Sequence, residues 1–336
     1  MLTRRQLLAA AAASTVLAAT PSFAQNQKVT MALDWTPNTN HIGLFVAQAK
    51  GYYAEAGLDV EILPYTDTSA GTLVANHIAD FGILGSISLF TQRSAGADLV
   101  ATYAVVQTET GRLVFNDART DIQRPRDLDG KVYGGFGSTW ENALIGNMIR
   151  FDGGTGEFET VTLGTSAYEA LANGAVDFTL EVYTWEGVKA ELDGVKQRAF
   201  RYADFGVPDQ HTTFIGSSQR YLDANPNTAS AFLSGTRRGY EFAVEHPDES
   251  AAILIEANKD VLTDPALIRA SLQALIDGHY LRTADGVIGT IDPTKVSALG
   301  DYLLKEGVLR DGNGDALSSI PDVTAYYSNA YLPGGK

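Results

Sequence analysis

The chain contains no cysteine among its 336 residues. This absence excludes disulfide bonds, thiolate metal sites, cysteine nucleophiles and the lipid-modified cysteine that tethers many exported bacterial proteins. Histidine is scarce too, and no two of the five histidines have the spacing of a metal-ligand pair. We therefore expect no metal site and no bound cofactor. The histidines are His41, His77, His211, His246 and His279.

Long hydrophobic runs are absent after residue 24. The apolar run from Leu7 to Ala19 is too short to span a bilayer comfortably. Arg4 and Arg5 precede this run, and small residues follow it where a signal peptidase reads, which predicts a secretory signal peptide over residues 1–24. "LTRRQLL" resembles a twin-arginine export signal, and an ordinary Sec signal with two arginines is the alternative. We expect a soluble protein of a bacterial periplasm that is not a lipoprotein.

Positive charge is scarce relative to negative charge. The sequence has 25 Lys and Arg residues against 40 Asp and Glu residues, which gives a net charge of −15. Removal of the signal peptide takes away two positive charges, Arg4 and Arg5, and no acidic residue, so −15 becomes −17. A surface of this sign repels nucleic acid and anionic lipid, so neither is an expected partner.

What the sequence does contain is an alternation of strand-like and helix-like segments. Short apolar runs predict strands, and runs with apolar residues at helical spacing predict the helices between them. Strands that alternate with short helices indicate a parallel sheet covered on both faces. The predicted strands span residues 28–35, 58–65, 80–85, 99–107, 111–117, 131–137, 158–164, 177–183 and 212–218, and the chain beyond is mostly helical.

Two of these segments divide the chain into units. The strand at 111–117 leaves the first unit, and the strand at 212–218 returns to it. We expect an α/β clamshell of two doubly wound lobes joined by a two-strand hinge. Ligands of such folds lie at the carboxyl ends of the strands, between the lobes. Lobe 1 is predicted to comprise residues 27–112 plus 213–336, and lobe 2 residues 113–212.

All three tryptophans of the chain stand on turns at predicted strand ends. They are Trp35, Trp140 and Trp185. Core tryptophans would more often lie within strands or on helix faces, so the coincidence favours a flat aromatic ligand stacked between rings over plain packing. Ser86 follows another strand end, where its hydroxyl can cap the next helix.

Other segments have two interpretations. In "YGGFGSTWE", Gly137 and Ser138 either bring backbone amides and a helix N-terminus to a ligand or form a tight turn with a serine cap. Glu181 and Glu186 are either a carboxylate pair for acid–base work or separate groups, of which one would match the amine of an amino-heterocycle. No nucleophile with its base is recognisable, so we expect no catalytic residues. Residues 311–322 faintly resemble a calcium loop but lack its glycine and final glutamate, so a surface turn is expected.

Five stretches resemble, in the same order, the periplasmic binding proteins related to the fungal pyrimidine synthase of thiamine biosynthesis (NMT1/THI5-like). In bacteria these proteins serve ABC importers for thiamine-pyrimidine precursors. The resemblance implies a type II periplasmic binding protein fold that closes on a formylaminopyrimidine or hydroxymethylpyrimidine type of ligand. The closed form would then dock on a membrane permease, and we expect a monomer. The five stretches are residues 32–65, which contain "DWTPNTNH", 77–96, 127–145, 174–188 and 221–251.

The resemblance also implies which side chains hold the ligand. In the family an aromatic sandwich and acidic side chains hold the pyrimidine. Here "EVYTWEG" stands where members often have "YWNWE", so Val182 replaces an aromatic residue and leaves open which ring completes the stack. By motif, the implied residues are Asp34, Trp35, Asn38 and His41 on lobe 1 and Tyr183, Trp185 and Glu186 on lobe 2.

Four alternatives remain open from the sequence, one of which is a sensor partner for a signalling receptor. The ligand is another flat heterocycle, such as riboflavin, or a small anion, such as a sulfonate. A sulfonate site should show more backbone amides or an arginine at the strand ends, and the nearest arginines, Arg93 and Arg112, do not stand on the turns at strand ends. The last alternative is an enzyme like the pyrimidine synthase. The enzyme of the family relies on a cysteine-rich motif, which this chain cannot supply.

Overall fold

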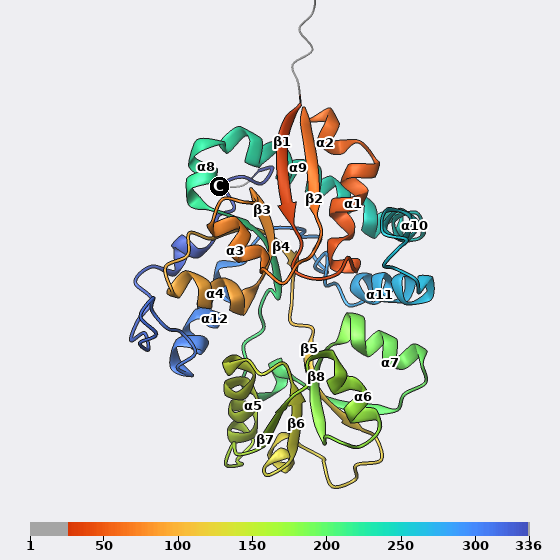
Figure 1. Ribbon diagram of the computed structural model, residues 1–336, viewed down its shortest axis with the longest axis vertical. Helices are drawn as coiled ribbons and strands as arrows, with labels where there is room; N and C mark the ends of the chain where they lie inside the picture. The colour runs from red at the N-terminus through yellow and green to blue at the C-terminus, as the bar shows by residue number, and fades with distance from the viewer. Residues whose placement is uncertain (1–25, 335–336) are drawn as a thin grey trace, which may run out of the picture.

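The computed structural model describes residues 26–334, which form two lobes stacked along the long axis of the molecule (Figure 1). The first lobe has a five-stranded sheet of order β2-β1-β3-β10-β4, and the second has a five-stranded sheet of order β7-β6-β8-β5-β9. The predicted two-lobed α/β fold is confirmed. The predicted export signal, residues 1–24, lies outside the described residues. Within the described part of the chain, no helix is both long and apolar enough to cross a membrane.

The first lobe is formed by two separate parts of the chain. The part before the crossing alternates strands with short helices, and the part after the return is mostly helical. Its elements are β1 (Gln27–Ala32), η1 (Thr39–His41), α1 (Ile42–Ala49), α2 (Tyr52–Glu55), β2 (Leu58–Leu63), α3 (Ala70–Ala75), β3 (Phe81–Gly85), α4 (Ser86–Ser94), β4 (Val100–Val106), β10 (Thr213–Ser217), α8 (Gln219–Ala224), α9 (Pro226–Glu245), α10 (Pro247–Ala257), α11 (Pro265–Asp277), α12 (Pro293–Lys305) and η6 (Val323–Tyr326).

The second lobe is one continuous stretch of chain. Strands and helices alternate through it until a last strand, β9, lies at the sheet edge. Its elements are β5 (Gly111–Asn116), η2 (Pro125–Leu128), β6 (Val132–Gly135), α5 (Thr139–Phe151), β7 (Glu159–Thr162), η3 (Gly164–Ser166), α6 (Ala167–Ala172), β8 (Phe178–Val182), the π-helical turn η4 (Tyr183–Gly187), α7 (Val188–Leu192), β9 (Gln197–Arg201) and η5 (Tyr202–Phe205).

Both sheets are mixed, whereas the sequence predicted parallel sheets. In the first sheet β10 runs antiparallel to β3 and β4, and in the second β5 runs antiparallel to β8 and β9. The reason is the way in which the chain crosses between the lobes. A strand that enters a lobe from the cleft must run away from the cleft, while its neighbours end there. Accordingly Thr213, the first residue of β10, pairs with Gly85, and Gly111, the first residue of β5, pairs with Val182.

The edge strand β9 is missing from the sequence prediction. Its sequence "QRAFR" has three polar residues, and Phe200 is its one buried side chain. An edge strand keeps much of its surface in solvent. Its sequence therefore lacks the apolar run by which the other strands are recognised.

The first sheet is covered on both faces. Buried side chains of α1, α9, α10 and α11 pack on one face, and those of α3, α4 and α12 pack on the other. Helices α1 and α9 approach closely, since a Cβ atom at Gly239 would lie 2.0 Å from the carbonyl oxygen of Gly43. Glycine at 239 is therefore required by space. The segment between β1 and α1, residues 33–41, is called the first cleft turn below. Because this turn leads into α1, the packing of α1 against α9 fixes the position of the turn.

The second sheet is filled unevenly. One face carries a large core that includes Tyr133, Met148 and Phe178. On the other face the buried cluster of described residues consists of Val114, Leu171 and Val176. At the sheet end away from the cleft, polar contacts join the strand starts.

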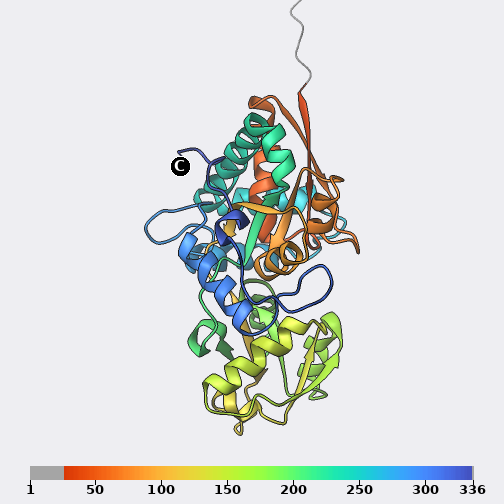
Figure 2. The same cartoon turned by 90° about the vertical axis from the view of Figure 1, so that its left-hand side faces the viewer.

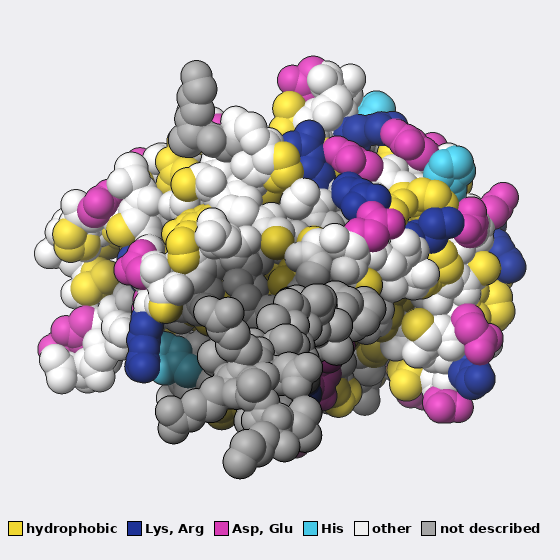
Figure 3. Space-filling view, turned by 90° about the horizontal axis from the view of Figure 1, so that it is seen from above, with side chains coloured by type: hydrophobic (Ala, Val, Ile, Leu, Met, Phe, Trp, Pro, Cys, Tyr) yellow, Lys and Arg dark blue, Asp and Glu magenta, His cyan; other side chains and the backbone are white. Residues whose placement is uncertain are grey.

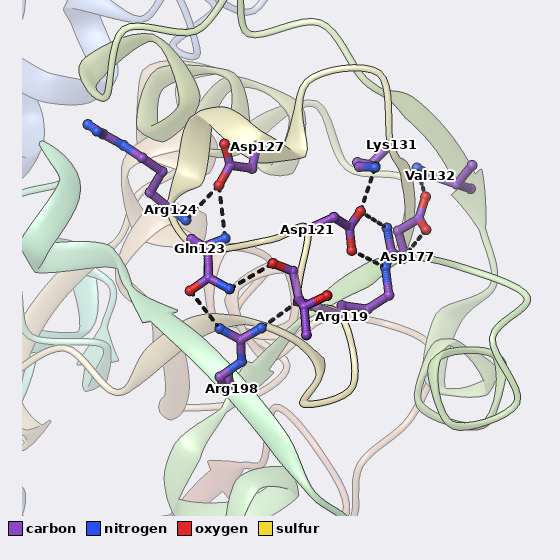
Figure 4. Close-up of polar contacts among 10 residues, drawn as sticks. Arg119, Asp121, Gln123, Arg124, Asp127, Lys131, Val132, Asp177 and Arg198 are labelled. Atoms are coloured by element: carbon purple, nitrogen blue, oxygen red, sulfur yellow. Dashed lines mark hydrogen bonds and ion pairs between the residues drawn. The ribbon is translucent and has the colours of Figure 1, made fainter.

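Arg119 lies between Asp121 and Asp177 at that end of the sheet (Figure 4). Asp177 accepts a hydrogen bond from the backbone N–H of Val132 at 2.7 Å, and Lys131 pairs with Asp121 at 2.9 Å. These contacts tie the loop after β5 to the first residues of β6 and β8. The charges of this cluster are thus used within the second lobe.

The surface of the first lobe mixes charges of both signs. In the view of Figure 3, Lys and Arg side chains lie beside Asp and Glu side chains. Ion pairs of this lobe include Lys50 with Glu249 at 3.0 Å and Arg238 with Glu55 at 2.8 Å. Exposed pairs of this kind contribute little to stability, and they leave no large basic patch on the described part of this face.

The two lobes touch on both sides of the crossing segments. Figure 2 shows α12 of the first lobe reaching toward α5 of the second. There Arg150 pairs with Glu306 at 3.4 Å, and the ring of Tyr302 packs against the second-lobe core. On the other side α11 lies against η4 and α7 (Figure 1). These contacts hold the lobes close together around the space between them.

Candidate functional site

A cavity of about 360 Å³ lies between the lobes, at the carboxyl ends of β1, β3, β6 and β8. This is where the fold class places ligands. The volume falls near the lower end of the range of roughly 300–1,000 Å³ that is typical of small-molecule sites. All three tryptophans of the chain line the cavity. The strand-end turns that carry them therefore meet in space.

His41 orients Asp34 in the first cleft turn. His41 is 1 % exposed, and its Nε2 lies 2.9 Å from Oδ1 of Asp34. Its other ring nitrogen, Nδ1, accepts a hydrogen bond from the backbone N–H of Asn38 at 3.3 Å. A nitrogen that accepts carries no proton, so Nε2 carries the proton and donates it to Asp34. His41 lies behind the cavity wall, and Asp34 forms part of that wall.

The rest of the first cleft turn is tied to the first-lobe core. Oδ1 of Asn38 accepts a hydrogen bond from the backbone N–H of Asn40 at 2.9 Å and caps η1. The hydroxyl of Tyr240, on α9, donates to the carbonyl oxygen of Asn40 at 2.6 Å. Asn38 of this turn thus caps η1, and the same residue lines the cavity.

The three tryptophans differ in what supports them. Trp140 packs against the second-lobe core, and Trp185 packs against the first-lobe core although it belongs to the second lobe. Trp35 is 39 % exposed, and its aromatic neighbour Tyr65 lies with ring centroids 5.3 Å apart and planes tilted by 46°. A ring so exposed at a cavity wall can offer a face to a planar ligand.

The cavity wall is acidic. Four carboxylates line it, and no Lys or Arg is among the described residues that do. Glu181 is buried and paired with Arg112, which lies outside the wall. A wall of this kind suits a ligand that donates hydrogen bonds or carries positive charge, and it disfavours an anion. The four carboxylates are Asp34, Glu109, Glu181 and Glu186.

Glu186 lacks a cationic partner among the described residues. Burial raises the pKa of its carboxyl to about 7. Its Oε2 accepts a hydrogen bond from the backbone N–H of Val182 at 3.1 Å. The residue stands on the π-helical turn η4, an irregular geometry that is frequent at functional sites. A carboxyl that titrates near neutrality can serve a ligand as acceptor or as donor.

The two arginines considered for an anionic ligand are used elsewhere. Arg112 pairs with Glu181, and its guanidinium lies 4.5 Å from the ring centroid of Tyr183. Arg93 donates a hydrogen bond to the carbonyl oxygen of Leu99. None of Arg93, Arg112 and Tyr183 lines the cavity.

The glycine-rich turn after β6, residues 134–138, is held by hydrogen bonds to the carboxylate of Glu141. The hydroxyl of Ser138 donates to Oε1 of Glu141 at 2.6 Å. The backbone N–H groups of Phe136 and Gly137 donate to its Oε2 at 2.9 and 3.3 Å. These amides already have an acceptor within the turn, so a ligand contact by Gly137 or Ser138 stays a prediction. The ring of Phe136, not singled out from the sequence, lines the cavity.

A buried polar chain between the two crossing segments was missed by the sequence analysis. The hydroxyl of Ser86 donates to Oε1 of Gln210 at 2.9 Å, and Nε2 of Gln210 donates to Oε2 of Glu109 at 2.5 Å. Oε1 of Glu109 accepts from the backbone N–H of Gly111 at 2.6 Å. Burial raises the pKa of Glu109. Ser86, Glu109 and Gln210 all line the cavity, so the hinge region forms its back wall.

The cavity brings together seven of the eleven predicted site residues. The other four do not line it, and contact of any of the eleven with a ligand stays a prediction. Tyr168 of α6 also lines the cavity and was not singled out. The seven are Asp34, Trp35, Asn38, Ser86, Trp140, Trp185 and Glu186, and the four are His41, Gly137, Ser138 and Tyr183.

The segment that faintly resembles a calcium loop forms a surface turn. Oδ1 of Asp311 accepts hydrogen bonds from the backbone N–H groups of Asn313 at 2.8 Å and Asp315 at 3.0 Å. Turns closed in this way are common at aspartate. Within residues 26–334, no three His, Asp or Glu side chains gather as a metal ion would need.

Comparison of the sequence with known proteins finds a matching protein family. The family model described as NMT1/THI5 like matches residues 38–250. The chain is 28% identical to the formylaminopyrimidine-binding protein of Halalkalibacterium halodurans, over 88% of this chain and 91% of that protein. It is 24% identical to the riboflavin-binding protein RibY of Chloroflexus aurantiacus, over 97% and 92% of the two chains. It is 23% identical to a 4-amino-5-hydroxymethyl-2-methylpyrimidine phosphate synthase of Saccharomyces cerevisiae, over 66% and 68%.

Solved structures of similar fold include periplasmic binding proteins. The periplasmic aliphatic sulphonate binding protein SsuA of Escherichia coli has a TM-score of 0.65 at 16% identity, covering 89% of this chain and 91% of that one. A periplasmic sulfonate-binding protein of a putative sulfonate ABC transporter from Methylobacillus flagellatus has a TM-score of 0.66 at 16% identity, covering 91% and 93%. At such identities the likeness shows the two-lobed binding-protein architecture.

Proposed function

The chain belongs to the NMT1/THI5-like family, and from this premise we propose that it is the solute-binding component of an ABC importer for a thiamine pyrimidine precursor. The ligand would be a pyrimidine of the formylaminopyrimidine or hydroxymethylpyrimidine type. The relative from Halalkalibacterium halodurans is named for binding formylaminopyrimidine, which supports this choice of ligand.

One observation carries the proposal: all three tryptophans and four carboxylates line one cavity, whose described wall contains no Lys or Arg. An aminopyrimidine is flat, so it can stack on Trp35, and its amine can donate to a carboxylate. Glu186 and Asp34 are the candidate acceptors. A ligand analogue without the amine would leave a buried carboxyl unpaired, which gives the site its selectivity.

The cavity argues against one alternative and the sequence against another. A sulfonate would meet carboxylates and no described cationic side chain at the wall, which is electrostatically unfavourable. An enzyme like the synthase would need its cysteine-rich motif, and the chain has no cysteine. We therefore infer a binding protein without catalytic residues or cofactor. Riboflavin remains the second candidate ligand, because the chain resembles RibY over nearly its full length.

The cellular setting belongs to the same proposal. The signal pattern over residues 1–24 and the periplasmic binding proteins of similar fold support export to a periplasm. There the protein would act as a monomer and deliver its ligand to a permease of the inner membrane. Nucleic acid and anionic membranes are disfavoured by the net charge of −15.

Calorimetry on the mature protein tests the proposal. We expect 4-amino-5-hydroxymethyl-2-methylpyrimidine or its formylaminomethyl analogue to bind, and Trp35→Ala to weaken that binding about tenfold or more through lost stacking and burial. Phe151→Ala is the control, because Phe151 is exposed and does not line the cavity. A thermal-shift panel of pyrimidines, flavins, sulfonates and nitrate completes the test. A shift with sulfonates alone, or unchanged pyrimidine binding by Trp35→Ala, would contradict the proposed site.

A further inference from the structure

A second cavity, of about 490 Å³, lies beside the first and mainly in the second lobe. The two cavities share five lining residues, which form the boundary between them. Three of the five are aromatic and two are acidic. They are Trp35, Tyr168, Glu181, Trp185 and Glu186.

The second cavity lies over the poorly filled face of the second sheet. Leu171 on α6 and Ala190 on α7 line it from two sides, and Leu267 on α11 reaches it from the first lobe. Val195, which also lines it, is 42 % exposed. Apolar side chains that face an empty space lose packing contacts, and an apolar hollow rimmed by polar groups is typical of a binding site. This face therefore lacks an apolar partner.

Outside the ion pairs at the second cavity, Lys196 and Glu186 supply one cationic and one acidic side chain, so the lining does not favour an ion of either sign. Lys189 pairs with Asp193, four residues further along the chain. Glu181 pairs with Arg112. The amide side chain of Gln197 lines the cavity and adds an uncharged polar group. An uncharged and largely apolar group, with at most a few polar atoms, matches this lining.

We propose that the second cavity is a subsite for a second, uncharged and largely apolar group of the same ligand. This group is joined to the heterocycle of the first cavity past Trp185 and Glu186, on the shared boundary. The inference rests on the proposed function, since it takes the heterocycle in the first cavity as given. It makes the preferred ligand a heterocycle with an extended substituent rather than a single bare ring.

Two probes that differ by one apolar group test the subsite. The first is 4-amino-5-hydroxymethyl-2-methylpyrimidine, and the second is its benzyl ether. We expect the wild-type protein to bind the benzyl ether about tenfold more tightly or better, because the phenyl group is buried in the second cavity. Ala190→Phe fills that cavity and removes the difference between the two probes. Leu192→Phe is the matched control, since Leu192 is an exposed residue of the same helix and does not line the cavity.

The outcomes separate the subsite from the proposed function. A benzyl ether that binds no more tightly than the alcohol overturns the subsite, and so does a gain that survives Ala190→Phe. In both cases binding of the alcohol leaves the proposed function in place. If neither probe binds, the proposed function fails and the subsite fails with it.

Discussion

The hydroxyl of Ser271, on α11 of the first lobe, donates a hydrogen bond to the carbonyl oxygen of Thr184, on η4 of the second lobe, at 2.5 Å. The hydroxyl of Thr39 lies 2.6 Å from that of Ser271. Ser271 has one proton to donate and gives it to Thr184, so Thr39 donates to Ser271. This buried relay connects the turn that carries Trp35 with the turn that carries Trp185. The two walls of the cavity are thus held together through Ser271, which does not line the cavity.

Ser271→Ala should speed the release of a bound pyrimidine. The change removes a bond between the lobes and leaves two buried groups, on Thr39 and Thr184, without their partner, which costs about 1–3 kcal/mol in the closed form. We expect the dissociation rate to rise about tenfold and the association rate to change little, because contacts made after encounter act mainly on release. Stopped-flow tryptophan fluorescence measures both rates.

Ser250→Ala is the matched control for this change. Ser250 is a fully buried serine of α10, and its hydroxyl has no hydrogen-bond partner in the described structure. Its removal should leave both rates as in the wild type. Equal dissociation rates for Ser271→Ala and Ser250→Ala would show that the relay does not hold the lobes closed.

His41→Phe should weaken ligand binding although His41 does not line the cavity. The phenylalanine keeps an aromatic ring of similar size but removes the donor to Asp34 and the acceptor of the Asn38 N–H. A hydrogen bond to a charged group contributes about 1.5–3 kcal/mol, so affinity should fall about tenfold or more. Isothermal titration calorimetry measures the change. His246→Phe, at an exposed histidine away from the cavity, is the control. Wild-type affinity in His41→Phe, with weakened binding in Asp34→Asn, would mean that Asp34 needs no such orientation.

How much of the site the sequence predicts depends on whether its residues follow one another along the chain. Trp35 and Asp34 directly follow a strand, and the rule for ligands at strand ends suffices to place them. Glu109 and Gln210 stand 101 residues apart and meet because both crossing segments pass the same point. Each reads alone as an ordinary loop residue. The family motif predicted a role for His41 at the ligand. The hydrogen bonds of the structure add that His41 orients Asp34 without lining the cavity itself.

Two features of the fold, the direction of the strands and the filling of the second sheet, could not be predicted from the sequence either. Apolar runs predict where strands lie, but their direction in a sheet depends on the side from which the chain enters. That is why the antiparallel β5 and β10 replaced the predicted parallel pairing. The uneven filling of the second sheet is likewise invisible in the sequence, since Leu171 and Val176 have the apolar pattern of any covered face.

Glu186 should lower the free energy of unfolding of the ligand-free protein as the pH rises from about 4.5 to about 7, its ordinary and its raised pKa. Burial raises this pKa, so the folded protein binds the proton more tightly than the unfolded chain does. The contribution is full below the unfolded pKa and is lost as the pH rises through the folded pKa. Burial also raises the pKa values of Glu109 and Glu181, which act in the same direction, whereas burial lowers the pKa of His211 to about 4, which acts in the opposite direction. Urea unfolding across this pH range measures the slope.

Glu186→Gln isolates the share of Glu186, because glutamine has no proton to lose. Over this pH range the free energy of unfolding of Glu186→Gln should fall less, or rise more, with pH than that of the wild type. Glu169→Gln, at an exposed carboxyl of α6, should keep the wild-type slope. Parallel curves for the wild type and Glu186→Gln would contradict a raised pKa at this residue.

Gly111→Ala should destabilise the protein through the first crossing segment. A Cβ atom at Gly111 would lie 2.2 Å from Cε2 of the buried Tyr202 ring and 2.9 Å from Oε1 of Glu109. The backbone of Gly111 is not in the left-handed region, so the substitution tests space alone. Overpacking of this kind costs about 1–3 kcal/mol, and displacement of Glu109 should weaken ligand binding as well. Urea unfolding and calorimetry measure the two effects.

A double-mutant cycle with Tyr202→Leu, which makes room for the new methyl group, should give a combined loss smaller than the sum of the single losses. Additive losses would mean that the alanine methyl group and the Tyr202 ring do not compete for the same space.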